Sequence, residues 1–414
     1  MSLKMKSGRN WGRLGMTFNI KQVQLKDLLL EPIRNGLTKP KAIRGRGVPM
    51  IAMGEIFANN RIFSFPMERV PVTDKELSSS SIYEGDLLFA RQSLVLEGAG
   101  KCCIVKEVNE PTVFESHLIR VRLDNSKALP DYIYYYFNSY QGKENIKTIV
   151  EQVAAAGIRG RDLVNLYIPI PPITVQQQIL QVLMSIDDKT AINTTINENL
   201  EQQAQAIFSN LFPKCMSNGI AMSNIIDVRD GTHDSPKAKK EGYSLITSKH
   251  LQAYSVNKKE ANLISYEDFN KINERSKVEY GDILISMIGT VGIISFISDK
   301  SIDFAIKNVG LFRTSQSAKL RFYVLNYLKT NEVANYIEQH LAGSTQKYIS
   351  LTELRNLPIR IPSDEDLQEY NELISPIYGQ IITLSKENQW LTELRDTLLP
   401  KLMNGEIDVS EVKI

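Results

Sequence analysis

The chain has 414 residues, of which 43% are hydrophobic and 23% are charged, and its formal net charge is +2. These values are typical of a soluble globular protein with two or three domains, and they exclude a surface that is basic all round. No apolar run reaches the roughly 18 residues that a membrane-spanning helix needs, and three cysteines, two of them adjacent, make no disulfide framework. We therefore expect a cytoplasmic protein with no membrane segment.

A first globular module is predicted for residues 1–172. Its first segment, Met1 to Phe18, is basic and has no apolar core, so we expect it to be disordered or partly added in cloning rather than a secretory signal. Strands are predicted over residues 48–57, 86–90 and 102–108, and helices over residues 131–138 and 145–156. The tyrosines of the helix at 131–138 are expected to pack in the core rather than to stack on bases. Pro171 and Pro172 then end the module.

Residues 173–212 predict a long helix, because apolar side chains recur at alternating steps of four and three residues. Residues 213–362 predict a second module, and residues 363–414 a second long helix with a C-terminal tail. Such spacing indicates that the two helices pack on each other, and the short connections around the prolines favour an antiparallel arrangement. The predicted seam positions are Ile179, Leu183, Ile186, Leu200, Ile207 and Leu211 on the first helix, and Ile374, Ile381, Leu384, Leu391 and Leu398 on the second.

Polar residues interrupt this seam at Thr190, Asn193, Asn197 and Asn388. They either fix the register of the two helices or merely hydrate the seam, and the sequence favours neither alternative. Pro376 is expected to kink the second helix or to delay its start.

The second module repeats the order of motifs in the first. The matched anchors lie 195 (231 − 36), 196 (282 − 86) and 191 (354 − 163) residues apart: Gly36 with Gly231, Asp86 with Asp282, and Leu163 with Leu354. A nearly constant offset indicates duplication. We therefore predict an α+β protein in which two duplicated globular α/β modules are separated by two long antiparallel, coiled-coil-like helices.

The sequence carries no signature of catalysis. It lacks the phosphate-binding GxxxxGK[ST] loop, the GxGxxG turn, the GxSxG elbow and the metalloprotease helix, and the stretch from Gly289 to Gly292 favours a hairpin. Asp187 and Asp188 point about 100° apart on a helix, which favours a solvated face over a metal pair. None of the four histidines has metal-ligand spacing. We predict no catalytic residue, no metal and no cofactor on this chain.

The strongest binding signal is a set of basic side chains on loops at matching places of both modules. Such side chains could neutralise DNA phosphates, although a solvated basic loop is the alternative. Arg91, Gln92 and Ser93 follow a predicted strand in a turn, where Arg could read guanine and Gln adenine; the second copy has Ser286, Met287 and Ile288 there. The predicted DNA-binding residues are Lys39, Lys41, Arg44, Arg46, Arg91, Gln92, Arg159 and Arg161 in the first module, and His233, Lys237, Lys239, Lys240, Lys249, His250, Gln346 and Lys347 in the second.

From Val23 to Val409 the chain resembles the specificity (S) subunit of type I restriction-modification systems. The most specific matches are Tyr280-Gly281-Asp282-Ile283-Leu284, Gly343-Ser344-Thr345-Gln346-Lys347, the strands ending at Pro171 and Pro362, and the stretch from Leu391 to Ile407. The resemblance implies two target-recognition domains, each reading half of a bipartite double-stranded DNA target, separated by two antiparallel helices.

The same resemblance implies that the chain itself is not catalytic. It would recruit two methyltransferase (M) subunits and, through them, ATP-driven restriction (R) subunits. S-adenosylmethionine, ATP and Mg²⁺ are then expected on the partner subunits. Three alternatives stay open: a coiled-coil adaptor that binds proteins and reads no DNA, an enzyme with an unfamiliar site, and a subunit of a methyltransferase-only or fused type II system.

Overall fold

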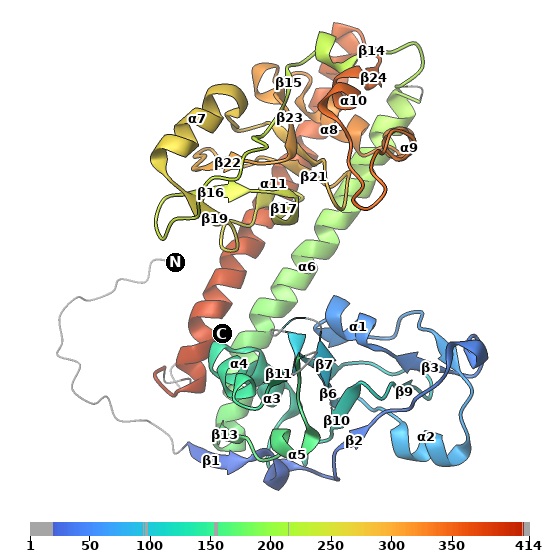
Figure 1. Ribbon diagram of the computed structural model, residues 1–414, viewed down its shortest axis with the longest axis vertical. Coiled ribbons are helices and arrows are strands. Elements are labelled where there is room, and N and C mark those ends of the chain that lie inside the picture. The colour runs from blue at the N-terminus through green and yellow to red at the C-terminus, as the bar shows by residue number, and fades with distance from the viewer. Residues whose placement is uncertain are drawn as a thin grey trace, which may run out of the picture. The chain divides into compact units, whose positions relative to one another are not determined.

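The computed structural model describes residues 20–93, 95, 98–152, 156–213, 215–407 and 409. The expectation of disorder for Met1 to Phe18 lies outside these residues. The chain divides into two compact units: residues up to Lys189 together with those from Trp390 onward, and residues Thr190–Gln389. The long helices α6, Ile173–Leu211, and α11, Asp364–Met403, each contribute to both units (Figure 1).

The module of the first unit is built on short strands. A five-stranded sheet has the order β2-β10-β6-β8-β4, a three-stranded sheet has the order β5-β3-β9, another has the order β11-β12-β7, and β1 pairs with β13. The strands are β1 Lys21–Gln24, β2 Arg34–Asn35, β3 Val48–Ile51, β4 Arg61–Ile62, β5 Arg69–Val70, β6 Leu87–Ala90, β7 Gln92–Ser93, β8 Cys102–Val105, β9 Val113–Phe114, β10 Leu118–Val121, β11 Glu151–Gln152, β12 Ala156–Gly157 and β13 Tyr167–Ile170. The helices are α1 Met53–Ala58, α2 Asp74–Ser80, α3 Pro130–Asn138, α4 Tyr140–Lys147 and α5 Gly160–Leu163.

The module of the second unit has a four-stranded sheet of order β15-β23-β20-β21, a three-stranded sheet of order β19-β16-β22, and the pairs β14-β24 and β17-β18. Its strands are β14 Ile220–Ala221, β15 Val228–Asp230, β16 Tyr243–Ile246, β17 Leu251–Gln252, β18 Ser255–Val256, β19 Asn262–Ile264, β20 Ile283–Ser286, β21 Ile294–Phe296, β22 Phe304–Ile306, β23 Val309–Phe312 and β24 Pro358–Ile359. Its helices are α7 Tyr266–Ser276, α8 Arg321–Leu328, α9 Asn331–Gln339 and α10 Leu351–Asn356.

The two modules share one topology, which confirms the predicted duplication and the α+β class. The order β2-β10-β6-β8 of the first recurs as β15-β23-β20-β21 in the second. The sheet β5-β3-β9 likewise corresponds to β19-β16-β22: the middle strand, β3 or β16, pairs antiparallel with one neighbour and parallel with the other. Helix α11, which follows the second module, begins 191 residues (364 − 173) after α6, which follows the first module.

The glycine of each Asn/Asp-Gly anchor is explained by a close approach of two backbones. A Cβ at Gly36 would lie 2.0 Å from the carbonyl oxygen of Phe114, and one at Gly231 would lie 2.3 Å from that of Ile306. In both copies the next residue donates its backbone N–H to that same oxygen. Because any side chain at this position would push the two segments apart, only glycine fits.

Several predicted boundaries were wrong. The strand predicted over 48–57 ends at Ile51, since the Glu55 carboxylate accepts the backbone N–H of Ala52 at 3.0 Å and starts helix α1. The helix predicted over 145–156 instead begins at Tyr140 and ends at Lys147, and β11 and β12 follow it. Gln92 and Ser93 form strand β7 rather than a turn. The hairpin predicted around Gly289 is confirmed, because β20 and β21 pair antiparallel.

The aromatic helix α3 belongs to the core, as predicted. Its four tyrosines are all buried. The Tyr132 hydroxyl donates to the carbonyl oxygen of Pro169 at 3.0 Å, so the helix is attached to strand β13. Tyr323, 191 residues later, donates in the same way to the carbonyl oxygen of Arg360. The phenol groups thus satisfy backbone acceptors inside each module.

Helices α6 and α11 pack antiparallel, as predicted. Within the second unit Asn193 contacts Asn388 and Asn197 contacts Ser385, so residue numbers rise along one helix as they fall along the other. Most of the predicted seam positions are buried or half-buried, and they pack against the module cores as well as against each other. Leu211 is the exception: it is 38% exposed, because it is the last residue of α6. Helix α11 begins twelve residues before Pro376, which therefore does not delay its start.

The seam asparagines make specific bonds within the second unit. Asn193 is fully buried, and its Nδ2 donates to Glu387 at 2.7 Å and to Asn388 at 3.0 Å. Asn197 donates to Ser385 at 3.1 Å. A buried amide that finds its partner in one register only favours the register-fixing alternative over simple hydration. No helix of the described residues combines the length and the apolar character needed to cross a membrane.

Candidate nucleic-acid interface

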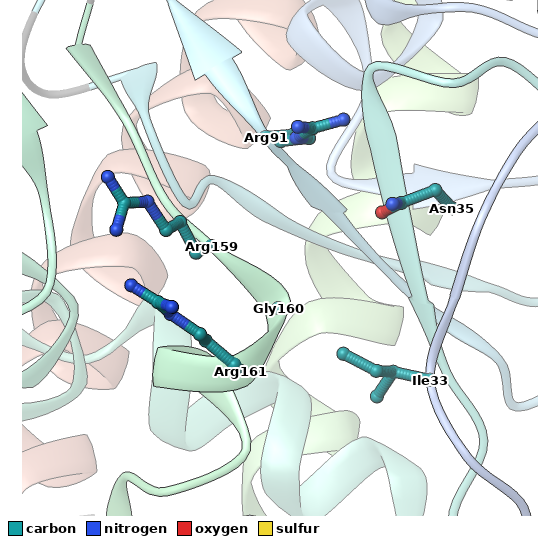
Figure 2. Close-up of a pocket in the computed structure, with 6 residues that line it drawn as sticks. All are labelled: Ile33, Asn35, Arg91, Arg159, Gly160 and Arg161. Atoms are coloured by element: carbon teal, nitrogen blue, oxygen red, sulfur yellow. The ribbon is translucent and has the colours of Figure 1, made fainter.

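Three of the predicted DNA-binding arginines of the first module line one hollow of about 470 Å³, shown in Figure 2. Arg91 follows strand β6, whereas Arg159 and Arg161 come from the start of helix α5. Asn35 of β2 and Ile33 complete the lining with Gly160. The fold therefore gathers side chains that are up to 128 residues (161 − 33) apart in the sequence.

The backbone of Arg91 is held on both sides. Its N–H donates to the carbonyl oxygen of His117 at 2.8 Å, and its own carbonyl oxygen accepts the N–H of Ile158 at 2.9 Å. The next residue, Gln92, pairs with Gly157 in the β7-β12 ladder and is exposed. No hydrogen bond or ion pair engages the Arg91 guanidinium among the residues that the structure describes. Two backbone hydrogen bonds thus hold Arg91 beside the hollow, and its guanidinium has no partner among the described residues.

Arg159 and Arg161 are more exposed than Arg91. Arg159 forms an ion pair with Glu151, and Arg161, whose side chain is 71% exposed, lies 3.6 Å from Asp162. Figure 2 shows both side chains extending in the same direction from the start of α5, away from Ile33. Exposed ion pairs of this kind are weak, so both guanidinium groups remain available to a polyanion.

The basic loop between Lys39 and Arg46 is only partly available. Lys39 is bound to Glu76 at 2.8 Å with 11% of its side chain exposed, and Arg44 is bound to Glu68 at 2.7 Å. These two ion pairs connect the loop to Glu76 and Glu68. Lys41 and Arg46 are exposed, and their side chains have no partner within the described part of the chain.

In the second unit a hollow of about 440 Å³ lies between the loop from Thr232 to Pro236 and helix α7. His233 lines it, and its Nε2 lies 3.0 Å from the buried carboxylate of Asp230, which also accepts Arg275. Lys271 and Arg275 of α7 were missed by the sequence reasoning. Their spacing of four residues places them on one face of a helix, and that signal could have revealed them.

The other predicted residues of the second module divide into exposed and buried ones. Lys237, Lys239, Lys240 and Lys249 are exposed, and no described residue binds their side chains. Gln346 and Lys347 are exposed on a loop closed by the pairing of Ala342 with Tyr348.

His250, another of the predicted DNA-binding residues, is buried in this structure. It is 2% exposed, and its Nδ1 accepts the backbone N–H of Thr247 at 3.0 Å. Burial lowers the pKa of His250, and the adjacent Lys249 lowers it further. In this structure the His250 imidazole therefore caps a turn.

The solvated face predicted for Asp187 was wrong. Its carboxylate is 14% exposed and accepts three charged or polar donors of the first unit: Arg61 at 2.6 Å, the Tyr135 hydroxyl at 2.6 Å and Arg395 at 3.2 Å. These donors come from β4, α3 and α11, so Asp187 ties the module to both long helices. Asp188, its neighbour, is exposed as expected.

The second unit has a polar tie at the matching positions. There the Tyr378 hydroxyl of α11 donates to the Asn326 side chain of α8 at 2.9 Å. Both residues lie 191 positions after their counterparts, Asp187 and Tyr135. In the first unit the donor, Tyr135, lies on the module helix α3, and in the second unit the donor, Tyr378, lies on the long helix α11. The hydrogen bond nevertheless joins the same two matching positions in both units.

No group of three or more metal-ligating side chains converges within the described ranges. The hollow of the first unit brings together three arginines and Asn35, and that of the second brings His233, Lys271 and Arg275 together with Asp234 and Asp268.

Comparisons with known proteins agree with this arrangement. The family model "Type I restriction modification DNA specificity domain" matches residues 19–202 and 223–393, one match for each module. The specificity subunit of type I restriction enzyme MjaIX from Methanocaldococcus jannaschii is 23% identical over 415 residues, which cover 91% of this chain and 90% of the relative. That of HindI from Haemophilus influenzae is 22% identical over 411 residues, covering 80% and 88%.

A solved structure has the same fold. The crystal structure of the type I restriction-modification S subunit from M. genitalium aligns with a TM-score of 0.53 at 14% identity, over 94% of this chain and 97% of that one. The chain therefore belongs to the DNA specificity (S) subunits of type I restriction-modification systems, a family whose members are not themselves catalytic.

Proposed function

We propose that this S subunit reads a bipartite DNA target, with one half-site for each module. The observation that carries the proposal is that the same topology occurs twice, each time with exposed cations beside a hollow. One module can contact only a few base pairs, so two modules on one chain would recognise two short DNA sequences. The cations add affinity that does not depend on sequence, and the side chains in the hollows add the choice of bases.

The long helices are proposed to set the distance between the half-sites. Helix α6 has 39 residues and is therefore about 58 Å long at about 1.5 Å per residue. One turn of B-DNA is about 34–36 Å, so a helix of this length is sufficient to separate two readers by more than a turn. The buried Asn193 pairs with Asn388 in one register only, which supports a fixed spacer rather than a sliding one.

The partners are proposed from the family. Two methyltransferase subunits would dock on the helices, where Trp390 of α11 is 58% exposed, and restriction subunits would join through them. S-adenosylmethionine, ATP and Mg²⁺ would then be bound by these partners, in the cytoplasm where the DNA is.

The test is modified-base mapping of DNA from cells that carry this gene with its methyltransferase gene, against cells that lack this gene alone. We expect a bipartite methyladenine motif that disappears with the gene. If the methyltransferase is expressed and no motif depends on this gene, the proposal fails, and a pull-down would then test the adaptor alternative.

A second experiment tests the role of the helices. Inserting one heptad into α6 and a matching heptad into α11 should lengthen the spacer and leave both half-sites unchanged. Altered half-sites with the original spacer would contradict the proposed role.

A further inference from the structure

The two modules differ in chemistry at one structurally identical position. The residue after β6 is Arg91 and the residue after β20 is Met287, 196 positions later. Both are held by the same backbone bond: the carbonyl oxygen of Arg91 accepts from Ile158 at 2.9 Å, and that of Met287 accepts from Ile349 at 2.9 Å. The two backbones are therefore equivalent, and the side chains can be compared directly.

The Arg91 side chain lines an open hollow, whereas Met287 is 4% exposed and packs in the core of its module. A buried thioether cannot reach a ligand. The first module therefore presents a guanidinium at a place where the second presents nothing.

The environment of Arg91 suits a base better than a phosphate. Its backbone is fixed on both sides, and its guanidinium is free among the described residues. Arg159 and Arg161 line the same hollow (Figure 2). They are more exposed than Arg91, which suits contacts with DNA phosphates. A guanidinium carries parallel donors in a rigid fork, and guanine presents two neighbouring acceptors, O6 and N7, in the major groove.

We infer that Arg91 reads a guanine in the half-site of the first module, and that the second module makes no matching contact. The inference rests on the proposed function and adds the chemical identity of one recognised base. It also makes the two half-sites chemically unequal, although the modules share one fold.

The experiment uses the complex of this S subunit with its methyltransferase subunits on a duplex that contains the mapped target. Each guanine is replaced in turn by 7-deazaguanine, which keeps base pairing and removes the N7 acceptor. We expect the wild-type complex to lose affinity about fivefold or more at one guanine of one half-site. Arg91→Ala should show a similar loss on the unmodified duplex and no further loss at that guanine.

Two variants separate base reading from other roles. Arg91→Lys keeps the charge without the fork, so it should keep the salt dependence of binding and lose the sensitivity at that guanine. Lys75→Gln removes a charge from the exposed face of α2 and should leave the whole 7-deazaguanine profile unchanged.

The outcomes are distinct. A sequence-specific complex in which no guanine is sensitive, or in which Arg91→Ala keeps the sensitivity, overturns the inference alone and assigns Arg91 to a phosphate. A wild-type complex that binds all duplexes alike overturns the proposed function and the inference with it.

Discussion

Replacing Asp187 with alanine should destabilise the first unit, although this residue was expected on a solvated face. The carboxylate accepts bonds from Arg61, Tyr135 and Arg395, and its removal leaves the half-buried Arg61 guanidinium without its carboxylate partner. Breaking a fully buried pair costs about 3–5 kcal/mol, and hydrogen bonds to charged groups contribute about 1.5–3 kcal/mol each. The Asp187 and Arg61 side chains are 14% and 21% exposed, so water replaces part of the bonding that the substitution removes. We expect a loss of about 2–3 kcal/mol.

The chain offers a matched control in Asp188→Ala, because this neighbouring carboxylate is exposed. Its removal should change the free energy of unfolding by no more than about 0.5 kcal/mol. The measurement is urea unfolding followed by the fluorescence of Trp390, in a background in which Trp11 is phenylalanine. Trp390 lies on α11 in the same unit as Asp187.

A double-mutant cycle identifies the bond itself. Tyr135→Phe removes only the hydroxyl and should cost about 1 kcal/mol in the wild-type protein. In the Asp187→Ala background the same change should cost a different amount, because the hydroxyl has lost its carboxylate acceptor and keeps only the bond that it accepts from Arg61 at 2.7 Å. Equal unfolding midpoints for the Asp187 and Asp188 variants, or additive effects in the cycle, would refute the assignment of Asp187 as a tie between module and helices.

Three further results are expected. Gly36→Ala should destabilise the first unit by more than about 1 kcal/mol in the same unfolding assay, because the new Cβ would lie 2.0 Å from a backbone oxygen. The control is Gly54→Ala in helix α1, where a Cβ would meet no atom within 4 Å, and it should be neutral or stabilising. Lys239→Ala and Lys240→Ala should weaken binding to all DNA sequences and each lower the slope of log affinity against log salt by about one; unchanged slopes would reject phosphate contact. Burial raises the pKa of Cys103 to about 12, so at pH 8 its thiol stays protonated; all three cysteines are buried, and a disulfide reagent should titrate none of them before unfolding and three afterwards.

The features that the sequence predicted correctly are those with a local or periodic signal. The heptad spacing located α6 and α11 because long helices repeat their pattern many times. The anchors Gly36 and Gly231 revealed the duplication because the same steric constraint acts in both copies. Two-residue strands such as β7 and β12 are too short to show any alternation, so their positions were missed.

The sequence says less about which basic side chains of the candidate interface are available, because availability depends on partners that are distant in the sequence. Lys39 is occupied by Glu76, 37 residues away, and Asp187 is bound by Arg61, 126 residues away. His250 differs from an exposed histidine only in its burial, which the neighbouring residues do not reveal. In contrast, the prediction for Arg91 and Arg159 rested on their positions relative to predicted strands, and the structure brings both to one hollow.

The two copies show which parts of the module are framework and which are free to differ. The bond from Tyr132 to the Pro169 carbonyl recurs as the bond from Tyr323 to the Arg360 carbonyl, although arginine has replaced proline. Backbone acceptors do not depend on the side chain that carries them, so such bonds survive substitution.

The same principle acts beside the hollow. The backbone bond at Arg91 recurs at Met287, while the side chain changes from a cation to a buried thioether. The main-chain bond is thus kept in both copies, whereas the side chain at this position lines a hollow in the first module and packs in the core of the second. Under the proposed function, side chains beside a repeated main-chain bond set the choice of bases, and two copies on one chain then recognise two different half-sites.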